Sequence, residues 1–339
     1  MRVSTYIVTG TAGFIGNRVA RMLLDEGHAV HGIDNVNDAY DVTIKHWRMR
    51  QIDGRDGYTF HKVDIRDREA LATVFAAAGS DSGGGNVDAV INLAARAGVR
   101  PSVQNPWIYT QTNTDGSLNL LDLCQKRGIG KYMLASTSSL YGNSESGKNA
   151  EDNDTNHVLS PYAASKKAAE AMAYTYHYLY GIDVTVCRYF TVYGPAGRPD
   201  MSLFRFVQWI SEERPLTLYG DGSQTRDFTY VDDIARGTIL ATNKKVGYDT
   251  FNLGSDTPTP LMDVINHIAG RIGKEPRFVY EERHPADVLH TWANIDKAKS
   301  VLGWSSQVGW QQGMDNLIEW YQENRDWAKD INTDPKADE

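Results

Sequence analysis

The chain has 339 residues with a formal net charge of −8, so it can bury a large core, and one large domain plus a smaller one is expected. The acidic balance argues against a nucleic-acid surface, no apolar run is long enough to span a bilayer, and no signal peptide precedes the first predicted strand. Cys124 and Cys187 lack metal-ligand spacing, so we expect buried free thiols, no bound metal and a cytoplasmic location.

The N-terminal segment has the pattern of a dinucleotide-binding loop. Residues 3–8 form a short β-branched run that predicts a strand, and an apolar-periodic segment from residue 14 to about 26 predicts a helix. Between them stand Gly10, Gly13 and Gly16, spaced for a tight turn, a close backbone approach to a diphosphate and close helix–strand packing. The exposed amides of the helix N-terminus favour an anionic diphosphate.

A second predicted strand, residues 29–33, ends at Asp34. A carboxylate at this position typically accepts hydrogen bonds from the adenosine ribose and repels a 2′-phosphate. The residues therefore predict NAD, rather than NADP, as the cofactor.

The rest of the first half alternates predicted strands and helices. Residues 35–56 are expected to be irregular, and residues 79–86 are expected to form a flexible glycine-rich loop. Further strands are expected at residues 58–63, 88–93, 131–135 and 184–188, with helices at about 67–78, before Gly128 and from Pro161. This succession predicts an α/β fold: a Rossmann-like, doubly wound parallel sheet with a smaller C-terminal α/β substrate-binding lobe. We expect a NAD-binding domain at 1–190, to which 229–255 returns, a lobe mainly for substrate binding at 191–325, and a polar tail at 326–339 that frays from about residue 329.

The sequence Ser160-Pro161-Tyr162-Ala163-Ala164-Ser165-Lys166 predicts a reactive tyrosine. Ser160 is a good N-cap and Pro161 suits the first helical position. Residues four apart share a helix face, so Lys166 would lie beside Tyr162 and lower the pKa of its phenol. The pattern alone also fits an ordinary solvated helix face. It indicates a reactive tyrosine only in combination with the other motifs of the chain.

Taken together, these motifs resemble the extended short-chain dehydrogenase/reductases, and more narrowly the NAD-dependent nucleotide-sugar 4-epimerases. The resemblance extends from about residue 2 to 325. It rests on the glycine loop, Tyr162-x-x-x-Lys166, the hydroxyl run 136–139 before Tyr141-Gly142, and the run from Arg188 to Pro195. Residues 34–41, 97–100 and 194–201 are similar to the UDP-glucuronate 4-epimerases in particular, and residues 221–233 resemble sugar-nucleotide enzymes more broadly.

The resemblance implies an isomerase that interconverts UDP-glucuronate and UDP-galacturonate through a 4-keto intermediate. Tyr162 would take the proton from the sugar O4, Thr137 would relay it, and Lys166 would hold the nicotinamide ribose. Dehydratases of this fold carry Asp and Glu after the threonine, and decarboxylases carry a Glu in the second position. This chain has Ser138 and Ser139, which cannot act as carboxylate acids or bases at neutral pH.

Arg198 is the residue on which the uronic-acid assignment depends. A guanidinium can bind a carboxylate with two charge-assisted hydrogen bonds, and could hold it out of alignment with the C4 ketone so that CO2 is not lost. An arginine between glycine and proline could equally face solvent or pair with Asp200. The chain has His284-Pro285-Ala286-Asp287 where the family usually has Gln-Pro-Gly-Asp, so the roles of His284 and Arg283 stay open.

The expected cofactor-binding residues are Gly10, Ala12, Gly13, Phe14, Ile15, Gly16, Asp34, Asn35, Asp64, Ile65, Leu93, Ala94, Ala95, Arg96, Tyr162, Lys166, Tyr189 and Val192. The expected substrate-binding residues are Val99, Arg100, Ser102, Thr137, Ser138, Ser139, Thr191, Arg198, Met201, Thr217, Leu218, Tyr219, Gln224, Arg226 and Asp287.

Other functions remain open at this point. The chain could be a 4-epimerase of a neutral UDP-hexose or UDP-N-acetylhexosamine, a UDP-glucuronate decarboxylase-like enzyme, or a non-enzymatic NAD-sensing scaffold. Scaffolds of this kind usually lose the tyrosine, the lysine or the tight glycine turn, and all three are present here. The resemblance also implies a symmetric homodimer.

Overall fold

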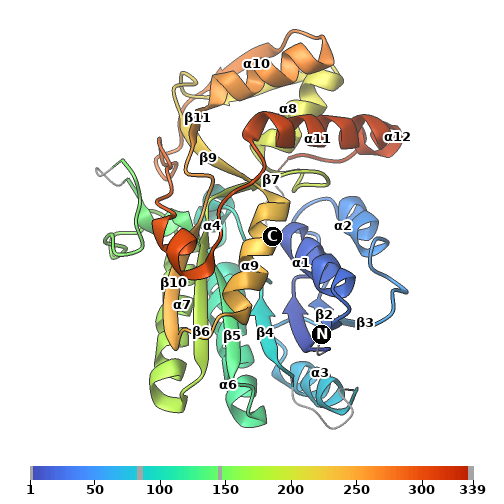
Figure 1. Ribbon diagram of the computed structural model, residues 1–339. Helices are drawn as coiled ribbons and strands as arrows, with labels where there is room; N and C mark the ends of the chain where they lie inside the picture. Colours follow the sequence, from blue (N-terminus) through green and yellow to red (C-terminus); the bar gives the residue numbers. More distant parts are fainter. Residues whose placement is uncertain (1–2, 82–86, 144–146, 335–339) are drawn as a thin grey trace.

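Seven parallel strands form the central sheet, as the computed structural model of residues 3–81, 87–143 and 147–334 shows (Figure 1). The strands are β1 (Thr5–Thr9), β2 (Ala29–Asp34), β3 (Tyr58–Lys62), β4 (Ala89–Asn92), β5 (Lys131–Thr137), β6 (Asp183–Tyr189) and β10 (Tyr248–Leu253). They lie in the order β10-β6-β5-β4-β1-β2-β3. The direction of winding reverses between β1 and β4, and ligands of doubly wound sheets bind at such a switch point. The predicted fold class is confirmed.

Helices cover both faces of this sheet because its strands are apolar on both sides. The helices of this part are α1 (Phe14–Asp25), α2 (Val42–Met49), α3 (Arg68–Asp81), α4 (Val99–Gln104), α5 (Pro106–Tyr109), α6 (Gly116–Arg127), α7 (Pro161–Tyr180) and α9 (Val231–Asn243). Helices α1 and α9 pack side by side on one face, where Val8 meets Val19 and Ile234 in one core cluster (Figure 1). Helices α3, α6 and α7 cover the other face, to which Ile7 points.

Two local predictions are wrong. The stretch 35–56 is not irregular throughout, because it contains α2, whose N-cap Asp41 accepts a hydrogen bond from the Thr43 amide. Helix α3 runs to Asp81, three residues past the expected end, so it includes the first part of the predicted loop. The remaining loop residues 82–86 lie outside the described part of the chain. Both errors arise because short amphipathic turns in polar segments gain their stability from tertiary packing, which local composition does not report.

A smaller lobe lies above the carboxyl ends of the strands (Figure 1). Its strands are β7 (Thr191–Tyr193), β8 (Pro215–Tyr219), β9 (Thr225–Tyr230), β11 (Pro258–Pro260) and β12 (Arg277–Glu281). Its helices are α8 (Ser202–Ser211), α10 (Leu261–Ile272), α11 (Trp310–Glu323) and α12 (Arg325–Ala328). The described helices and strands of the lobe surround a separate apolar core that includes Phe204, Ile265 and Leu317. Short single-turn segments η1 (Thr110–Asp115), η2 (Ser138–Tyr141) and η3 (Ala298–Leu302) complete the described helices.

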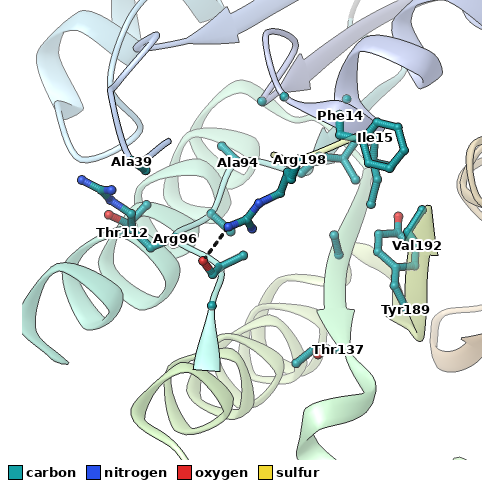
Figure 2. A pocket seen from close by; sticks show the side chains of 18 of the residues that line it. Phe14, Ile15, Ala39, Ala94, Arg96, Thr112, Thr137, Tyr189, Val192 and Arg198 are labelled. Carbon is teal, nitrogen blue, oxygen red and sulfur yellow. Dashed lines mark hydrogen bonds between the residues drawn. The ribbon is translucent and has the colours of Figure 1, made fainter. Parts of the chain in front are cut away.

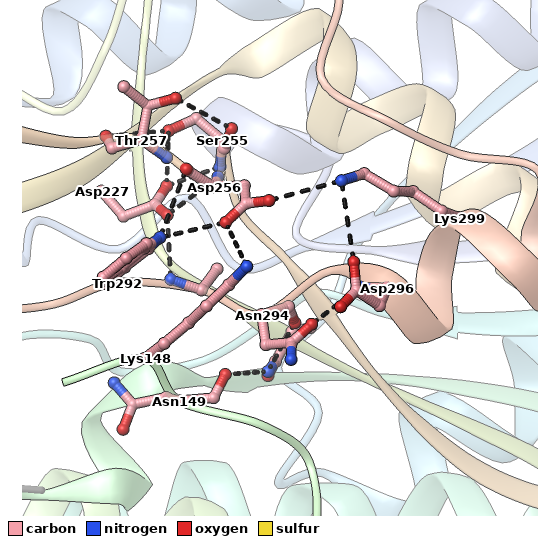
Figure 3. A network of polar contacts seen from close by, with 12 residues as sticks. Lys148, Asn149, Asp227, Ser255, Asp256, Thr257, Trp292, Asn294, Asp296 and Lys299 are labelled. Atoms are coloured by element: carbon pink, nitrogen blue, oxygen red, sulfur yellow. Dashed lines mark hydrogen bonds and ion pairs between the residues drawn. The ribbon is translucent and has the colours of Figure 1, made fainter. Parts of the chain in front are cut away.

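A buried carboxylate joins the sheet to the lobe. Asp227 on β9 accepts hydrogen bonds from the backbone amides of Ser255, Asp256 and Ala293, at 2.5, 3.1 and 3.0 Å (Figure 3). Asp256 in turn pairs with Lys148, which precedes α7 in the chain. Strand β9, which carries the predicted substrate residue Arg226, is thereby held against the segment that leaves β10.

The C-terminal segment does not fray at residue 329 as expected. Ile331 is 2% exposed, and the Gln208 side chain on α8 donates to its carbonyl and to that of Ala328. Arg205 donates to the carbonyl of Thr333. The segment therefore packs on the lobe as far as Thr333, and residues 335–339 lie outside the described part. Within the described ranges, no helix has the length and apolarity that a bilayer crossing requires.

Candidate active site

A cavity of about 370 Å³ lies at the carboxyl ends of the central strands (Figure 2). Every predicted cofactor-binding residue except Ala12 lines it. So do seven predicted substrate residues, namely Val99, Thr137, Ser138, Ser139, Thr191, Arg198 and Met201. Residues of β2, β5 and α7, and residues that directly follow β1 and β4, are far apart in sequence and meet in one site.

The glycine loop is shaped as a cradle for a diphosphate. Gly10 has φ +78°, which favours glycine, and a Cβ at Gly16 would stand 2.1 Å from the Gly10 carbonyl. The Asp34 carboxylate accepts hydrogen bonds from the amides of Ala12 and Val36, at 3.1 and 2.7 Å. Ala12 is fully buried beneath the loop, which explains why it does not line the cavity. These residues fit a bound NAD, with the diphosphate at the N-terminus of α1 and the ribose at Asp34.

Helix α7 presents Tyr162 and Lys166 to the same cavity. Its start follows the prediction: the Ser160 hydroxyl accepts a hydrogen bond from the Ala163 amide at 3.2 Å, and Pro161 occupies the first turn. The Lys166 ammonium is 4% exposed and donates to the Ala135 carbonyl at 2.9 Å. Burial lowers the pKa of Lys166 to about 8, and the charge of Glu170 opposes this shift.

The expected effect of Lys166 on the phenol is wrong for the protein by itself. Burial raises the pKa of Tyr162, and the interactions that lower it come from the Thr137 hydroxyl and the Arg198 guanidinium. The Lys166 ammonium is directed at a backbone carbonyl instead of the phenol. Helical spacing places two residues on one face, but it does not determine the hydrogen-bond partner of each polar side-chain group.

Thr137 ends β5 at the beginning of η2. Its hydroxyl accepts a hydrogen bond from the Ser139 amide at 3.1 Å and donates to the Ser139 hydroxyl at 3.1 Å. Ser138 and Ser139 line the cavity without a carboxylate beside them in the run 136–141. The segment supplies hydroxyl groups, which can hydrogen-bond a sugar, and no acid suited to elimination.

Arg198 reaches into the cavity and is already paired with an acid (Figure 2). Its Nε and Nη2 donate to the two carboxylate oxygens of Asp200 at 3.0 and 2.5 Å, and Nη2 also donates to the Ala97 carbonyl. Burial lowers the pKa of Arg198, but Asp200 outweighs this effect and the pKa lies above its ordinary value. Among the described residues, no acceptor lies within hydrogen-bond distance of its Nη1, so one edge of the guanidinium remains for a ligand.

The other predicted substrate residues form a second group, outside the cavity. Arg100 stacks on the Tyr219 ring, 3.6 Å from its centroid, and binds both carboxylate oxygens of Asp287. Arg226 donates to the carbonyls of Thr225 and Leu289. The remaining members are Ser102, which is fully buried, Thr217 and Leu218 on β8, and Gln224, which donates to the Tyr219 carbonyl. The structure brings Arg100, Tyr219 and Asp287 together, but as partners of one another.

Sequence reasoning missed several cavity residues. Three polar ones, Asn37, Tyr40 and Lys45, lie in the stretch expected to be irregular. Burial lowers the pKa of Lys45 to about 8, and the nearby Asp34 opposes this shift. Lys45 lies 4.9 Å from the Tyr40 ring centroid, and Arg198 lies 5.5 Å from it. The available signal was a tyrosine and a lysine shortly after Asp34 in the sequence. These cations favour anionic ligands at the site, although the chain as a whole has a net charge of −8.

The doubly wound sheet, the glycine cradle with Asp34, and the Tyr162–Lys166 pair define a dinucleotide-dependent enzyme of the short-chain dehydrogenase type. Residues 6–254 match the model of the NAD dependent epimerase/dehydratase family, and the chain belongs to that family. NAD is therefore its cofactor, as predicted from Asp34.

Similar proteins include epimerases of two sugar types. The chain is 50% identical to a UDP-glucuronate 4-epimerase of Thermodesulfobacterium geofontis, over 96% of this chain and 98% of that protein. The structure resembles that of a UDP-glucuronic acid 4-epimerase from Bacillus cereus in complex with UDP-glucuronic acid and NAD, with TM-score 0.86, 34% identity, and coverage of 94% and 99% of the two chains. It also resembles a UDP-glucose 4-epimerase from Thermotoga maritima, with TM-score 0.86, 28% identity, and coverage of 95% and 99%.

Proposed function

We propose that this protein catalyses the reversible, NAD-dependent C4 epimerisation of UDP-glucuronate to UDP-galacturonate. The observation that carries the proposal is the arrangement of Tyr162, Thr137 and Arg198 around one cavity that also contains the cofactor cradle. The 50% identity to a UDP-glucuronate 4-epimerase over nearly the full length supports the same substrate. The enzyme is an isomerase, because its cofactor returns to the starting state in each cycle.

The chain's own residues provide a path for the O4 proton. Tyr162 takes the proton as a general base, and Thr137, whose hydroxyl interacts with the phenol, relays it. Bound NAD would supply the hydride acceptor and donor for C4. Lys166 would hold the nicotinamide ribose, as its place in the cavity wall and its lowered pKa support. The 4-keto sugar turns in the cavity and is reduced on its opposite face.

Ser138 and Ser139 support epimerisation over elimination or decarboxylation. Both line the cavity directly after Thr137, where neutral hydroxyl groups can bind the sugar but cannot remove a proton from carbon at neutral pH. The intermediate therefore keeps its substituents while it turns.

Arg198 supports a uronic acid as the substrate. Its free Nη1 edge can donate charge-assisted hydrogen bonds to a 6-carboxylate, while Asp200 and the Ala97 carbonyl fix the rest of the side chain. One observation favours a second candidate, a neutral UDP-hexose: Asp200 already balances the arginine charge, and the Thermotoga maritima relative acts on UDP-glucose.

Arg198→Ala should separate the two candidates. A charge-assisted hydrogen bond contributes roughly 1.5–3 kcal/mol, so we expect the KM for UDP-glucuronate to rise by about 10–100-fold. The KM for UDP-glucose, if that sugar turns over, should change by much less. Coupled assays on both sugars provide the measurement, with released CO2 quantified as well. The freed carboxylate can align with the C4 ketone, so the variant should release more CO2 per turnover than the wild-type enzyme.

A matched variant controls for the acid that this substitution exposes. Arg198→Ala leaves the Asp200 carboxylate unpaired, and that charge would repel a uronate. In the double variant Arg198→Ala/Asp200→Asn the loss should be smaller than in the single variant, but should still be greater for the charged sugar. Equal losses on both sugars in the double variant, without extra CO2, would assign Arg198 a structural role and favour the neutral substrate.

We also propose that the protein forms a symmetric homodimer through α5 and α7. These helices contact each other and carry exposed apolar side chains, which together define the proposed apolar face: Trp107 on α5, and Tyr174, Tyr178 and Leu179 on α7. Trp107 and Tyr178 are 75% and 76% exposed. A twofold interface is self-complementary, so one apolar face of this kind serves both copies.

Light scattering should give about twice the 37.8 kDa mass of one chain. Tyr178→Lys should shift the protein toward monomer, because it places a charge in the proposed interface. Tyr280→Lys replaces a 63% exposed tyrosine on β12, outside this face, and should leave the mass unchanged. A monomeric wild-type protein at micromolar concentration would refute the dimer.

A further inference from the structure

Arg48 is a buried arginine with no assigned role. It lies near the end of α2, is 2% exposed, and has no carboxylate within ion-pair distance among the described residues. A buried cation is costly unless its hydrogen bonds are satisfied. Its acceptors are instead three backbone carbonyls and one phenol, which belong to two separate parts of the active site.

One end of the guanidinium holds the dinucleotide loop. Nη1 donates to the Ala12 carbonyl at 3.2 Å, inside the glycine cradle. The Arg48 backbone carbonyl also accepts a hydrogen bond from the side chain of Asn17 on α1, and the same side-chain nitrogen donates to the Thr11 carbonyl. Helix α2 is therefore tied to the cradle through both the side chain and the main chain of Arg48.

The other end holds the turn that leads to Arg198. Nε donates to the Ala196 carbonyl at 2.9 Å, and Nη2 donates to the Gly197 carbonyl at 3.0 Å. Ala196 has φ +52°, a conformation that costs a non-glycine residue free energy and persists only where the surroundings impose it. The Arg48 guanidinium therefore donates to the carbonyls of Ala196 and Gly197, the two residues immediately before Arg198.

Tyr40 forms a second connection between the same two arginines. Its hydroxyl accepts a hydrogen bond from Arg48 Nη1 at 2.8 Å, and its ring lies 5.5 Å from the Arg198 guanidinium. Arg48 thus positions both the backbone that precedes Arg198 and the aromatic ring beside it.

We propose that Arg48 is a positioning residue that couples the cofactor loop to the Arg198 turn. Binding of the cofactor to the glycine loop would then control how well the Arg198 side chain is placed to bind an anionic sugar. Ordering of residues 10–16 by the cofactor is transmitted through the Ala12 carbonyl, the Arg48 guanidinium and the carbonyls of Ala196 and Gly197. Arg48 touches neither the cofactor nor the sugar in this scheme. Its effect on sugar selectivity rests on the proposed function, whereas the coupling itself does not.

Hydrogen exchange tests the coupling without reference to turnover. NAD added to NAD-free wild-type protein should slow amide exchange in residues 10–16 and in residues 194–201. Arg48→Lys keeps the charge but cannot bridge the same acceptors. In this variant NAD should still protect residues 10–16, whereas the protection of residues 194–201 should fall by about tenfold. Equal protection of residues 194–201 in the variant and the wild type would overturn the proposal.

Steady-state kinetics tests the consequence for the substrate. In Arg48→Lys the KM for UDP-glucuronate should rise by about tenfold, while the inhibition constant of UDP, which has no carboxylate, should stay unchanged. Arg50→Lys, at an exposed position two residues along the chain, should match the wild type in both measurements. If the exchange result appears but the KM does not change, the coupling stands and the uronate assignment is what fails.

A milder variant covers the case in which Arg48→Lys does not fold. Tyr40→Phe removes only the phenol acceptor and keeps the ring beside Arg198. It should reduce NAD-dependent protection of residues 194–201 in the same direction, by about twofold. Unchanged protection in this variant, together with an unfolded Arg48→Lys, would identify Arg48 as a purely structural residue.

Discussion

Tyr162→Phe should keep the fold and retain NAD, but should lose turnover by about 10²–10⁴-fold, the usual contribution of a positioned acid–base group. The phenyl ring fills the same place beside Tyr109, whose ring centroid lies 6.2 Å away, so the packing of α7 is preserved. Only the hydroxyl is removed, and with it the proton acceptor, whose pKa is raised by burial and lowered in part by the Thr137 hydroxyl and the Arg198 guanidinium. Single-turnover kinetics with UDP-glucuronate measure the loss.

Two further measurements distinguish this loss from a folding or binding defect. The thermal unfolding midpoint and the NAD content of Tyr162→Phe should match those of the wild type, and UDP-glucuronate should bind with similar affinity. Turnover within a factor of two of the wild type would exclude Tyr162 as the general base.

Lys166→Met should abolish most of the activity and at the same time stabilise the NAD-free protein. The ammonium is buried, its one acceptor among the described residues is the Ala135 carbonyl, and burial lowers its pKa from 10.5 to about 8. A shift of this size corresponds to about 3 kcal/mol of unfavourable free energy while the group is charged. Methionine has a similar length and carries no charge. After allowing about 1 kcal/mol for the lost hydrogen bond, we expect the free energy of unfolding at pH 7 to rise by about 1–3 kcal/mol.

The pH dependence of this gain has a definite sign. Between about pH 8 and 10.5 the folded wild-type protein binds fewer protons at Lys166 than the unfolded chain, so its stability rises with pH relative to the variant. The gain should therefore be full below pH 8 and should vanish as the pH approaches 10.5. Denaturant unfolding at pH 7, 9 and 10.5 provides the test, with Lys167→Met on the same helix as the control. A variant less stable than the wild type at pH 7 would show that the ammonium is stabilising.

Local patterns were sufficient for the elements that hold the cofactor. The tight glycine turn at Gly10, the end of β2 at Asp34 and the Ser160 cap each depend on a few neighbouring residues, and each appears in the structure as predicted. The prediction of the parallel sheet succeeded for the same reason, because continuous apolar runs separated by amphipathic helices admit few other arrangements. The same patterns did not identify helix α2 or the packed C-terminal segment, whose stability comes from contacts with distant residues.

The sequence by itself determined the family, the cofactor and the chemical groups of the site, because those depend on residue types at short, characteristic spacings. Only the tertiary structure decided which groups meet. It directed Lys166 to a carbonyl, paired Arg198 with Asp200 and Arg100 with Asp287, and placed Arg48 between the cofactor loop and the Arg198 turn. A long cationic side chain can reach many partners, and the choice among them depends on burial and on acceptors brought close by remote parts of the chain.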